Sequence, residues 1–175
     1  MISTFAFARI RSKVTLSPMR LIPLLALVGL ISSAKGTLTA TFTSGSQSVT
    51  REAALPALQV TKGESPTSGL PSGPFTATYK GTLSIPKRYR LTFSLESAGA
   101  IKLKIADEDV PFVYGKDGDN SIGVAERIRL NPGETPIEIT FTSLEDGSGS
   151  FRLFWEERRE FPAEPIPASA FKSID

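Results

Sequence analysis

Carboxylate side chains gather in three short segments of this sequence, and they are among the reactive groups it offers. Glu96 stands beside Ser97, an acidic triplet spans residues 107–109, and residues 117–120 read Asp-Gly-Asp-Asn. Oxygen ligands of this kind bind hard cations such as calcium, which takes about six to eight of them. Two carboxylates held about 5–9.5 Å apart across a cleft also serve most glycosidases. Each segment is therefore a candidate site for metal binding, sugar binding or acid–base chemistry.

The chain contains no histidine and no cysteine. This excludes imidazole and thiolate metal ligands, disulfides, and nucleophiles activated by a histidine. Asp107-Glu108-Asp109 is either a cation ligand or a solvated turn. The segment 117–120 is either half of a calcium loop or a glycine turn, because the complete calcium-loop spacing is absent. We expect no bound metal or cofactor, with a surviving calcium site as the alternative, and no enzyme activity.

Aromatic side chains supply a second kind of binding chemistry, because a ring face can lie against the apolar face of a sugar. Trp155, Tyr79 and Tyr89 are in phase with apolar neighbours two residues away, so we expect them in the core. A sugar-stacking role is the alternative for Trp155. Tyr114 stands in a polar stretch beside Asp117 and is predicted to be exposed.

The charge balance argues against a nucleic-acid partner. The chain has 20 lysines and arginines and 18 acidic residues, but four of the basic residues lie within the first twenty positions. The remainder has 16 basic and 18 acidic residues, a formal charge of −2, and so lacks an overall basic surface. We interpret the basic residues of 87–90 and Arg158-Arg159 as solvated charges that discourage pairing between sheet edges.

The N-terminal segment has the features of an export signal. Arg20 precedes an uncharged apolar run of eleven residues, 21–31, and small residues follow the run. The run fits the apolar core of a signal peptide, roughly 7–15 residues, and is shorter than the ~20 residues of a membrane-spanning helix. We predict a signal-peptide helix over residues 1–34, with Met19 as a possible true start and cleavage after Ala34. An uncleaved membrane anchor is the alternative.

Beyond this segment, apolar residues alternate with polar ones between turn residues, and no convincing amphipathic helix is present. Residues 91–105 hold two such strands around a short loop, 96–100, and are predicted to form a hairpin. Residues 114–121 are predicted to be a longer polar loop, and 144–150 a link between two antiparallel strands. Short strands with one apolar face predict an all-β fold, an antiparallel sandwich. The alternating segments are 38–42, 75–83, 89–95, 101–105, 128–130, 137–141 and 151–155.

The same pattern divides the chain after the signal into two parts. Residues 35–69 are predicted to be an N-terminal strand and loop region that packs on the sandwich. Residues 70–175 are predicted to be the sandwich with a proline-rich tail. The stretch 61–74 is rich in glycine, proline and serine, and we expect it to run over the surface as a loop. The tail is expected to be extended and anchored by Ile166 and Phe171.

Three segments in order carry a family pattern: GPFTATYKGTLSIPKRYRLTFSLESAGAIKLKI, then ERIRLNPGETPIEITFTS, then SFRLFWEERREFPAEPIPASAF. They contain a strand ending in Gly-x-Leu, a Tyr-x-Phe-like strand, a Leu-x-Ile strand, a proline-glycine turn and a strand with the single tryptophan. This order resembles the protective-antigen-type (PA-fourteen) domain family over roughly residues 70–172. It is similar to the version found in exported proteins of planctomycete-like bacteria.

The resemblance implies a β-sandwich of the jelly-roll type, often a carbohydrate-binding accessory domain. In the sugar-binding branch of the family, adjacent aspartates in the loop after the Tyr-x-Phe-like strand hold a calcium ion that grips sugar hydroxyls. Ala98 and Gly99 stand about where that pair belongs, and neither side chain offers an oxygen. The resemblance therefore implies a degenerate calcium and sugar loop.

We predict an exported, non-catalytic module that binds a glycan or an envelope protein through loops at one end of the sandwich. A protein–protein interaction or scaffold module of the envelope, without sugar binding, is the alternative. Export without cysteine is typical of a bacterial periplasm, cell surface or extracellular space, with membrane contact only through an uncleaved signal. The candidate ligand-binding residues are Glu96, Ser97, Asp107, Asp109, Tyr114, Asp117 and Asp119, and none is assigned to a metal.

Overall fold

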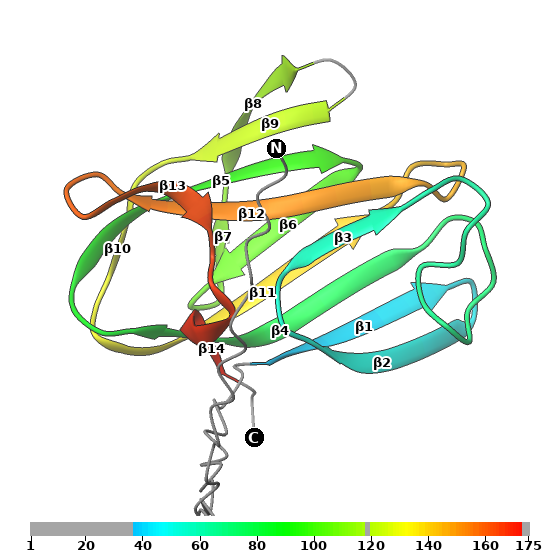
Figure 1. The fold of residues 1–175 in the computed structure, drawn as a ribbon, viewed down its shortest axis with the longest axis horizontal. Coiled ribbons are helices and arrows are strands. Elements are labelled where there is room, and N and C mark those ends of the chain that lie inside the picture. The colour runs from blue at the N-terminus through cyan, green and yellow to red at the C-terminus, as the bar shows by residue number, and fades with distance from the viewer. Residues whose placement is uncertain (1–36, 118–119, 173–175) are drawn as a thin grey trace, which may run out of the picture. The chain divides into compact units, whose positions relative to one another are not determined.

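The computed structural model describes residues 37–117 and 120–172, so the predicted signal peptide and Met19 lie outside the described residues. The described part consists almost entirely of antiparallel β-strands in two sheets that pack face to face (Figure 1). The exception within those ranges is one short 3-10 helix, Ala168–Ala170. None of the described residues forms a helix long and apolar enough to cross a membrane. The predicted all-β antiparallel sandwich is confirmed.

One sheet, called sheet A, has the strand order β2-β1-β4-β11-β6-β7, and β14 also pairs with β4. β1 pairs with the first half of β4 and β14 with residues in its second half, so both lie along the same edge. Gly81 lies on β4 between the two paired stretches, next to both β1 and β14. A Cβ added at Gly81 would lie 2.5 Å from the side chain of Leu38 on β1 and 3.1 Å from the carbonyl oxygen of Lys172 on β14. The strands are β1 (Leu38–Ser44), β2 (Gln47–Ala53), β4 (Thr76–Ile85), β6 (Ala100–Ile105), β7 (Glu108–Val110), β11 (Gly133–Thr142) and β14 (Phe171–Lys172).

The other sheet, called sheet B, has the strand order β13-β12-β5-β9-β8. Two further strands extend it, since β10 pairs with the start of β5 and β3 pairs with the start of β12. The strands are β3 (Ala57–Val60), β5 (Tyr89–Ala98), β8 (Phe112–Asp117), β9 (Asn120–Ala125), β10 (Ile128–Leu130), β12 (Gly149–Glu157) and β13 (Phe161–Pro165).

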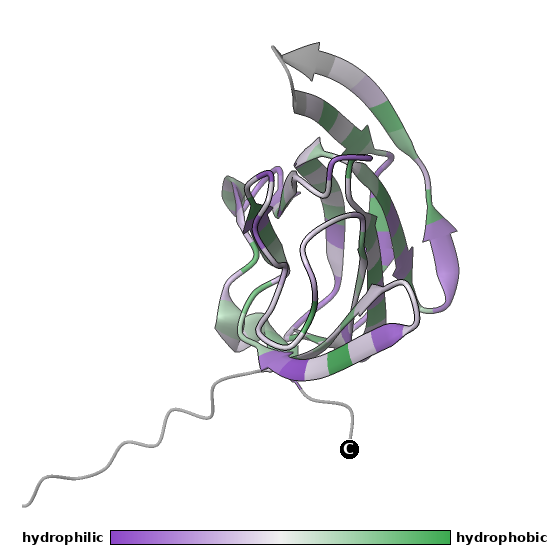
Figure 2. Cartoon of the chain, turned by 90° about the vertical axis from the view of Figure 1, so that its right-hand side faces the viewer, coloured by the Kyte–Doolittle hydropathy of each residue, from purple (hydrophilic) through white to green (hydrophobic). Residues whose placement is uncertain are grey.

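The alternating apolar residues form the core between the two sheets. Phe93, Leu103, Ile139 and Trp155 come from four strands of both sheets, and none is more than 7% exposed. Figure 2 shows the same alternation as hydrophobic and hydrophilic bands along the strands. Each such side chain contributes roughly 1.5–3 kcal/mol when fully buried. The core therefore accounts for the fold without any ligand.

Residues 91–105 do not form the predicted hairpin. β5 belongs to sheet B and β6 to sheet A, so the chain crosses the sandwich between them. The predicted loop at 96–100 is also wrong, because β5 runs to Ala98 and β6 begins at Ala100. Gly99 alone separates the two strands, with a φ of +133° that favours glycine. The chain therefore changes sheets within one residue.

The predicted polar loop over 114–121 is instead most of a hairpin. β8 and β9 pair in antiparallel register along their lengths and project beyond the two layers at the top of Figure 1. Val113 and Val124 lie opposite each other on this hairpin and are 77% and 46% exposed. Because much of the hairpin is in solvent, its sequence needs no apolar alternation, and its glycine and polar residues are typical of a loop.

Two connections also differ from expectation. The stretch 61–74 contains no strand, as predicted, but Pro66, Thr67 and Leu70 within it are buried, so it does not simply run over the surface. Leu70 joins the hydrophobic core, which explains why this loop lies against the sandwich. The segment 144–150 does not link two neighbouring antiparallel strands, because it connects β11 of sheet A to β12 of sheet B.

The C-terminal tail is anchored as predicted. Ile166 and Phe171 are each 1% exposed and extend the core beyond β13. Trp155 is 7% exposed, and its indole N–H donates to Oε1 of Glu164 on β13 at 3.4 Å. Its predicted place in the core is confirmed, and no face of its ring is free for a sugar. Tyr89 is half-buried and packs against the core.

Tyr79 is 2% exposed, and its hydroxyl donates to the carbonyl oxygen of Ala57 at 3.4 Å. Burial raises the pKa of Tyr79 from 10.0 to about 12, and the charge of Arg51 opposes this rise only in part. The folded state favours the neutral phenol, so this stabilisation is complete below pH 10 and is lost as the pH rises through 12.

We expect the free energy of unfolding, measured by urea denaturation, to fall by about 2–3 kcal/mol across this alkaline window because of Tyr79. The variant Tyr79→Phe has no ionisable hydroxyl and is expected to lose this part of the pH dependence. The same alkaline slope in the variant and the parent would contradict the assignment.

Candidate functional site

Two predicted site residues, Asp109 and Tyr114, line one groove of about 650 Å³, called the Tyr114 groove. It lies at the edge of sheet A, where β7 pairs with β6 only from Leu103 to Ile105. The first part of β6 therefore has no strand neighbour on that side, and the start of β8 borders this open edge. The polar and aromatic side chains that line the groove are Lys102, Lys104, Asp109, Phe112, Tyr114, Glu138 and Thr140.

Tyr114 is 50% exposed and stays at the groove through three contacts. Its hydroxyl donates to the carbonyl oxygen of Ile101, on the unpaired edge of β6, at 3.5 Å. Gly123 lies opposite it in the β8–β9 ladder, and a Cβ there would lie only 3.0 Å from the tyrosine ring. The ring of Phe112 packs with a centroid distance of 6.1 Å. Partial burial raises the pKa of Tyr114, so the hydroxyl remains a donor at neutral pH.

The charges that line the Tyr114 groove balance. Lys104 lies opposite Asp109 in the β6–β7 ladder and opposite Glu138 in the β6–β11 ladder. Glu138 also forms an ion pair with Lys80, with an N–O distance of 3.0 Å. Together with Lys102, the lining has two lysines and two carboxylates. The groove therefore offers hydrogen-bond donors and acceptors without a net charge, next to an exposed aromatic ring.

Asp107 lies beside the groove rather than in it. Ala106 and Asp107 form the turn between β6 and β7, with φ of 53° and 66°. Asp107 lines a smaller hollow of about 200 Å³ that shares Lys104 and Glu138 with the groove. Across residues 37–117 and 120–172, no three carboxylates are grouped so that they could hold a metal ion.

Glu96 and Ser97 lie on β5, away from the groove. Glu96 is exposed, whereas Ser97 is 2% exposed and its Oγ has no hydrogen-bond partner among the described residues. Ser97 lines a separate hollow of about 420 Å³ with Ser121, Ser143 and Glu145, which we call the rim pocket. The predicted residues of 96–97 and of 106–114 are thus in separate places.

The remaining predicted residues lie at the tip of the β8–β9 hairpin. Asp117 ends β8, opposite Asn120, and Asp119 lies outside the described residues. Sequence reasoning did not find Lys104 and Glu138, because each is an outward residue of a core strand and by itself is typical of a solvated face. The only signal was their alternation, which gives the face of a strand but not its neighbours.

Comparison of the sequence with protein-family models gives no match, and no curated protein matches it. Similarity is found at the level of structure. The chain is similar to the PA14 sugar-binding domain from RTX adhesin, with a TM-score of 0.63 and 12% identity, covering 79% of this chain and 98% of that one. It is also similar to the PA14 domain of MpAFP Antifreeze protein, with a TM-score of 0.62 and 10% identity, covering 78% and 89%.

A third similar structure is an anti-sigma factor domain-containing protein from Clostridium clariflavum. The TM-score is 0.65 and the identity 14%, covering 80% of this chain and 48% of that one. The chain thus spans about half the length of that protein. At these identities the similarities show the fold alone, and the fold is PA14-like.

Proposed function

We propose that this chain is an exported, non-catalytic module that binds a neutral carbohydrate in the Tyr114 groove without calcium. The observation that carries the proposal is the half-exposed Tyr114 ring beside a groove of about 650 Å³ whose lysines and carboxylates balance. The similarity in fold to a PA14 sugar-binding domain of an adhesin supports it.

The groove suits a neutral ligand that carries many hydroxyl groups. Small-ligand sites combine apolar or aromatic surface with a few placed polar groups, within roughly 300–1,000 Å³. Sugar hydroxyls accept hydrogen bonds from Lys102 and Lys104 and donate to Asp109 and Glu138, which line the same groove. The exposed part of Tyr114 provides an aromatic face for the apolar side of a sugar ring.

The ion pairing of the groove supports binding rather than hydrolysis. A glycosidase needs one carboxyl group held protonated, usually in apolar surroundings, as a general acid. Glu138 instead pairs with Lys80 at 3.0 Å, and both side chains are at least 36% exposed. Glu138 therefore lacks the apolar surroundings that a general acid needs.

The calcium mode of the sugar-binding branch does not fit this chain. An added Cβ at Gly99 would lie 2.6 Å from the ring of Phe141 and 2.7 Å from the carbonyl oxygen of Thr142. No aspartate can therefore occupy that position without moving the backbone, and Ala98 offers no oxygen. We propose that the Tyr114 groove holds sugar through its own polar groups, so chelating calcium should leave binding unchanged.

Export is part of the same proposal. The apolar run 21–31 with its basic start supports a signal segment over 1–34 and a place in the periplasm, at the cell surface or outside the cell. We propose that the sequence pattern over 70–172, which resembles the version found in exported proteins of planctomycete-like bacteria, reflects the same placement. The sandwich is then the binding part, and its two sheets include β1, β2 and β3 from the region before residue 70.

The test is to screen the chain on an array of neutral and acidic glycans, then titrate the best neutral oligosaccharide by calorimetry with calcium or a chelator. We expect Tyr114→Ala to weaken binding roughly tenfold or more, about 1.4 kcal/mol, because it removes the aromatic face. Tyr114→Phe keeps the ring and should lose less. Val113→Ala, on the opposite face of the same strand, is the matched control.

The proposal fails if no neutral glycan binds, or if Tyr114→Ala and Val113→Ala have equal effects. Loss of glycan binding on addition of the chelator would show that binding depends on calcium, contrary to the proposal.

A specific observation favours a second candidate function, recognition of a protein partner. β8 is an edge strand of sheet B, and the exposed Val113 and Val124 form an apolar pair on the projecting hairpin. An extended segment of another protein can add to such an edge by main-chain hydrogen bonds. Under this alternative, the parent chain binds no glycan on the array but captures an envelope protein, and Val113→Lys abolishes that capture.

A further inference from the structure

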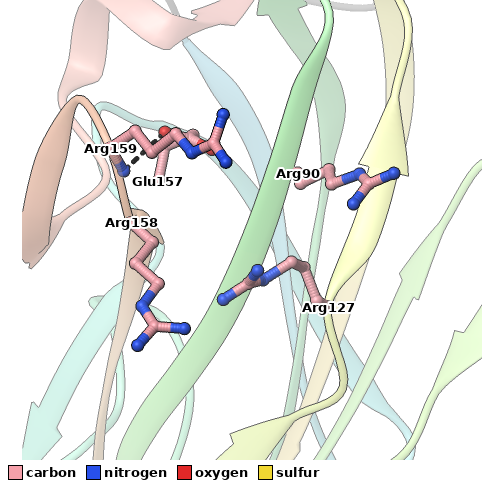
Figure 3. A pocket seen from close by; sticks show the side chains of 5 residues that line it. All are labelled: Arg90, Arg127, Glu157, Arg158 and Arg159. Carbon is pink, nitrogen blue, oxygen red and sulfur yellow. Dashed lines mark hydrogen bonds between the residues drawn. The ribbon is translucent and has the colours of Figure 1, made fainter.

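Four arginines from distant parts of the chain line one pocket of about 590 Å³, called the arginine pocket (Figure 3). Arg90 lies on β5, and Arg127 lies just before β10. Arg158 and Arg159 form the turn between β12 and β13, and Glu157, the last residue of β12, completes the lining. Figure 3 shows these side chains on both sides of the strand that carries Arg90.

The guanidinium groups of this pocket are not neutralised by nearby carboxylates. Within the described ranges, none of the four guanidinium groups takes part in an ion pair. Oε2 of Glu157 accepts the backbone N–H of Arg159 at 2.8 Å. Glu160, which follows in the same turn, pairs with Lys87 at 2.8 Å. The lining therefore has four positive charges and one negative charge.

A fifth arginine increases this local charge. Arg129 on β10 lies directly opposite Arg90 in the β10–β5 ladder, and both side chains are exposed. Like charges directly opposite each other in a ladder destabilise a sheet. The chain after its first twenty residues has a formal charge of −2, so this concentration does not reflect a basic composition. An anionic ligand bound between these guanidinium groups would attract them and so offset their mutual repulsion.

The lining restricts the chemistry of that ligand. Guanidinium groups bind carboxylate, sulfate and phosphate oxygens through paired hydrogen bonds. No lining residue is aromatic, so the pocket has no stacking surface for nucleic-acid bases. The exposed large hydrophobic side chains of the described residues all lie elsewhere, so the pocket has no group to insert into a lipid surface.

We infer that the arginine pocket is a binding site for a compact polyanion that carries two or more sulfate or phosphate groups, such as a sulfated saccharide. A single carboxylate would balance only part of the excess positive charge. The arginine pocket shares no lining residue with the Tyr114 groove, so the inference is independent of the neutral-sugar proposal.

The test measures calorimetric binding of a trisulfated disaccharide, the same disaccharide without sulfate, and inorganic triphosphate. We expect the sulfated disaccharide to bind and its unsulfated form not to bind at this site. The double variant Arg127→Gln/Arg158→Gln should weaken binding roughly tenfold or more, because it removes two charge-assisted contacts. Lys62→Gln/Arg152→Gln changes the net charge equally outside the pocket and should change the affinity less than about twofold.

A second readout separates a ligand site from a structural role. Arg129→Gln removes one member of the opposed arginine pair, so it should keep or raise the thermal unfolding midpoint while weakening polyanion binding. Tyr114→Ala should leave polyanion binding unchanged, so failure of the neutral-sugar proposal is distinguishable from failure of this one.

Stronger binding of the sulfated disaccharide than of triphosphate supports the site and identifies a saccharide as the carrier. Equal or stronger binding of triphosphate supports the site and identifies free phosphate compounds. The inference is overturned if neither the sulfated disaccharide nor triphosphate binds, or if the two double variants weaken binding equally.

Discussion

Replacing Gly99 with alanine is expected to lower the free energy of unfolding by about 3–5 kcal/mol, because two costs add at this position. The first is backbone strain, since a φ of +133° is unfavourable for any residue with a Cβ. The second is crowding, since the new Cβ would lie 2.6 Å from the ring of Phe141 and 2.7 Å from the carbonyl oxygen of Thr142. A carbonyl oxygen in a β-ladder cannot rotate away, so the crossing between the sheets must distort.

Two other glycines separate these costs. Gly133 has a φ of +123° with no atom within 4 Å of an added Cβ, so Gly133→Ala should cost only the strain, about 1–3 kcal/mol. Gly149 has no positive φ, but an added Cβ would lie 2.5 Å from the ring of Phe141. The loss in free energy of unfolding for Gly149→Ala therefore measures the cost of crowding without the backbone strain. All three are measured by urea denaturation. Equal losses for Gly99→Ala and Gly133→Ala would show that the crowding is relieved at little cost.

Phe141→Ala is expected to lower the free energy of unfolding by about 3–5 kcal/mol. Phe141 is fully buried, stacks on Phe151 with a centroid distance of 5.4 Å, and lies 5.8 Å from the ring of Phe75. Its ring also fills the space that Gly99 and Gly149 leave free. The alanine variant leaves a cavity next to the rings of Phe75 and Phe151. These two rings cannot both move in to fill it, so most of the cost of the cavity remains.

Two comparisons test this account of Phe141 by urea denaturation. Phe154 is only half-buried, so Phe154→Ala should cost clearly less. Gly99→Ala should also cost less when introduced into Phe141→Ala than into the parent, because the ring that its Cβ would meet is gone. Strictly additive losses for Gly99→Ala and Phe141→Ala would contradict the contact between the two positions.

The layered β fold could be predicted from the sequence because period-two alternation reports directly which side chains face the core. Phe93, Leu103 and Ile139 are buried as their spacing predicts. Alternation does not report which sheet a strand joins. The strands on either side of Gly99 have identical patterns whether they pair with each other or face each other across the core, so the predicted hairpin was wrong.

The sites were harder to predict because they depend on residues that are distant in the chain. Tyr114 was predicted to be exposed, and it is, but the balanced charges around it come from β6, β7 and β11. Arg90, Arg127 and Arg158 each look like an ordinary solvated charge in the sequence. Only the pairing of β10 and β12 with β5 brings them to one pocket.

The shared edge of β4 determines how this module responds to mechanical load. Leu38 and Lys172 lie on either side of Gly81, so both ends of the described chain leave the sandwich at one corner. Tension between two tethers attached there acts first on β14, which two registered residue pairs hold to β4, whereas five hold β1. We therefore expect the C-terminal strand to peel away before the sandwich yields, and the Tyr114 groove and the arginine pocket, neither lined by β14, to outlast the first rupture.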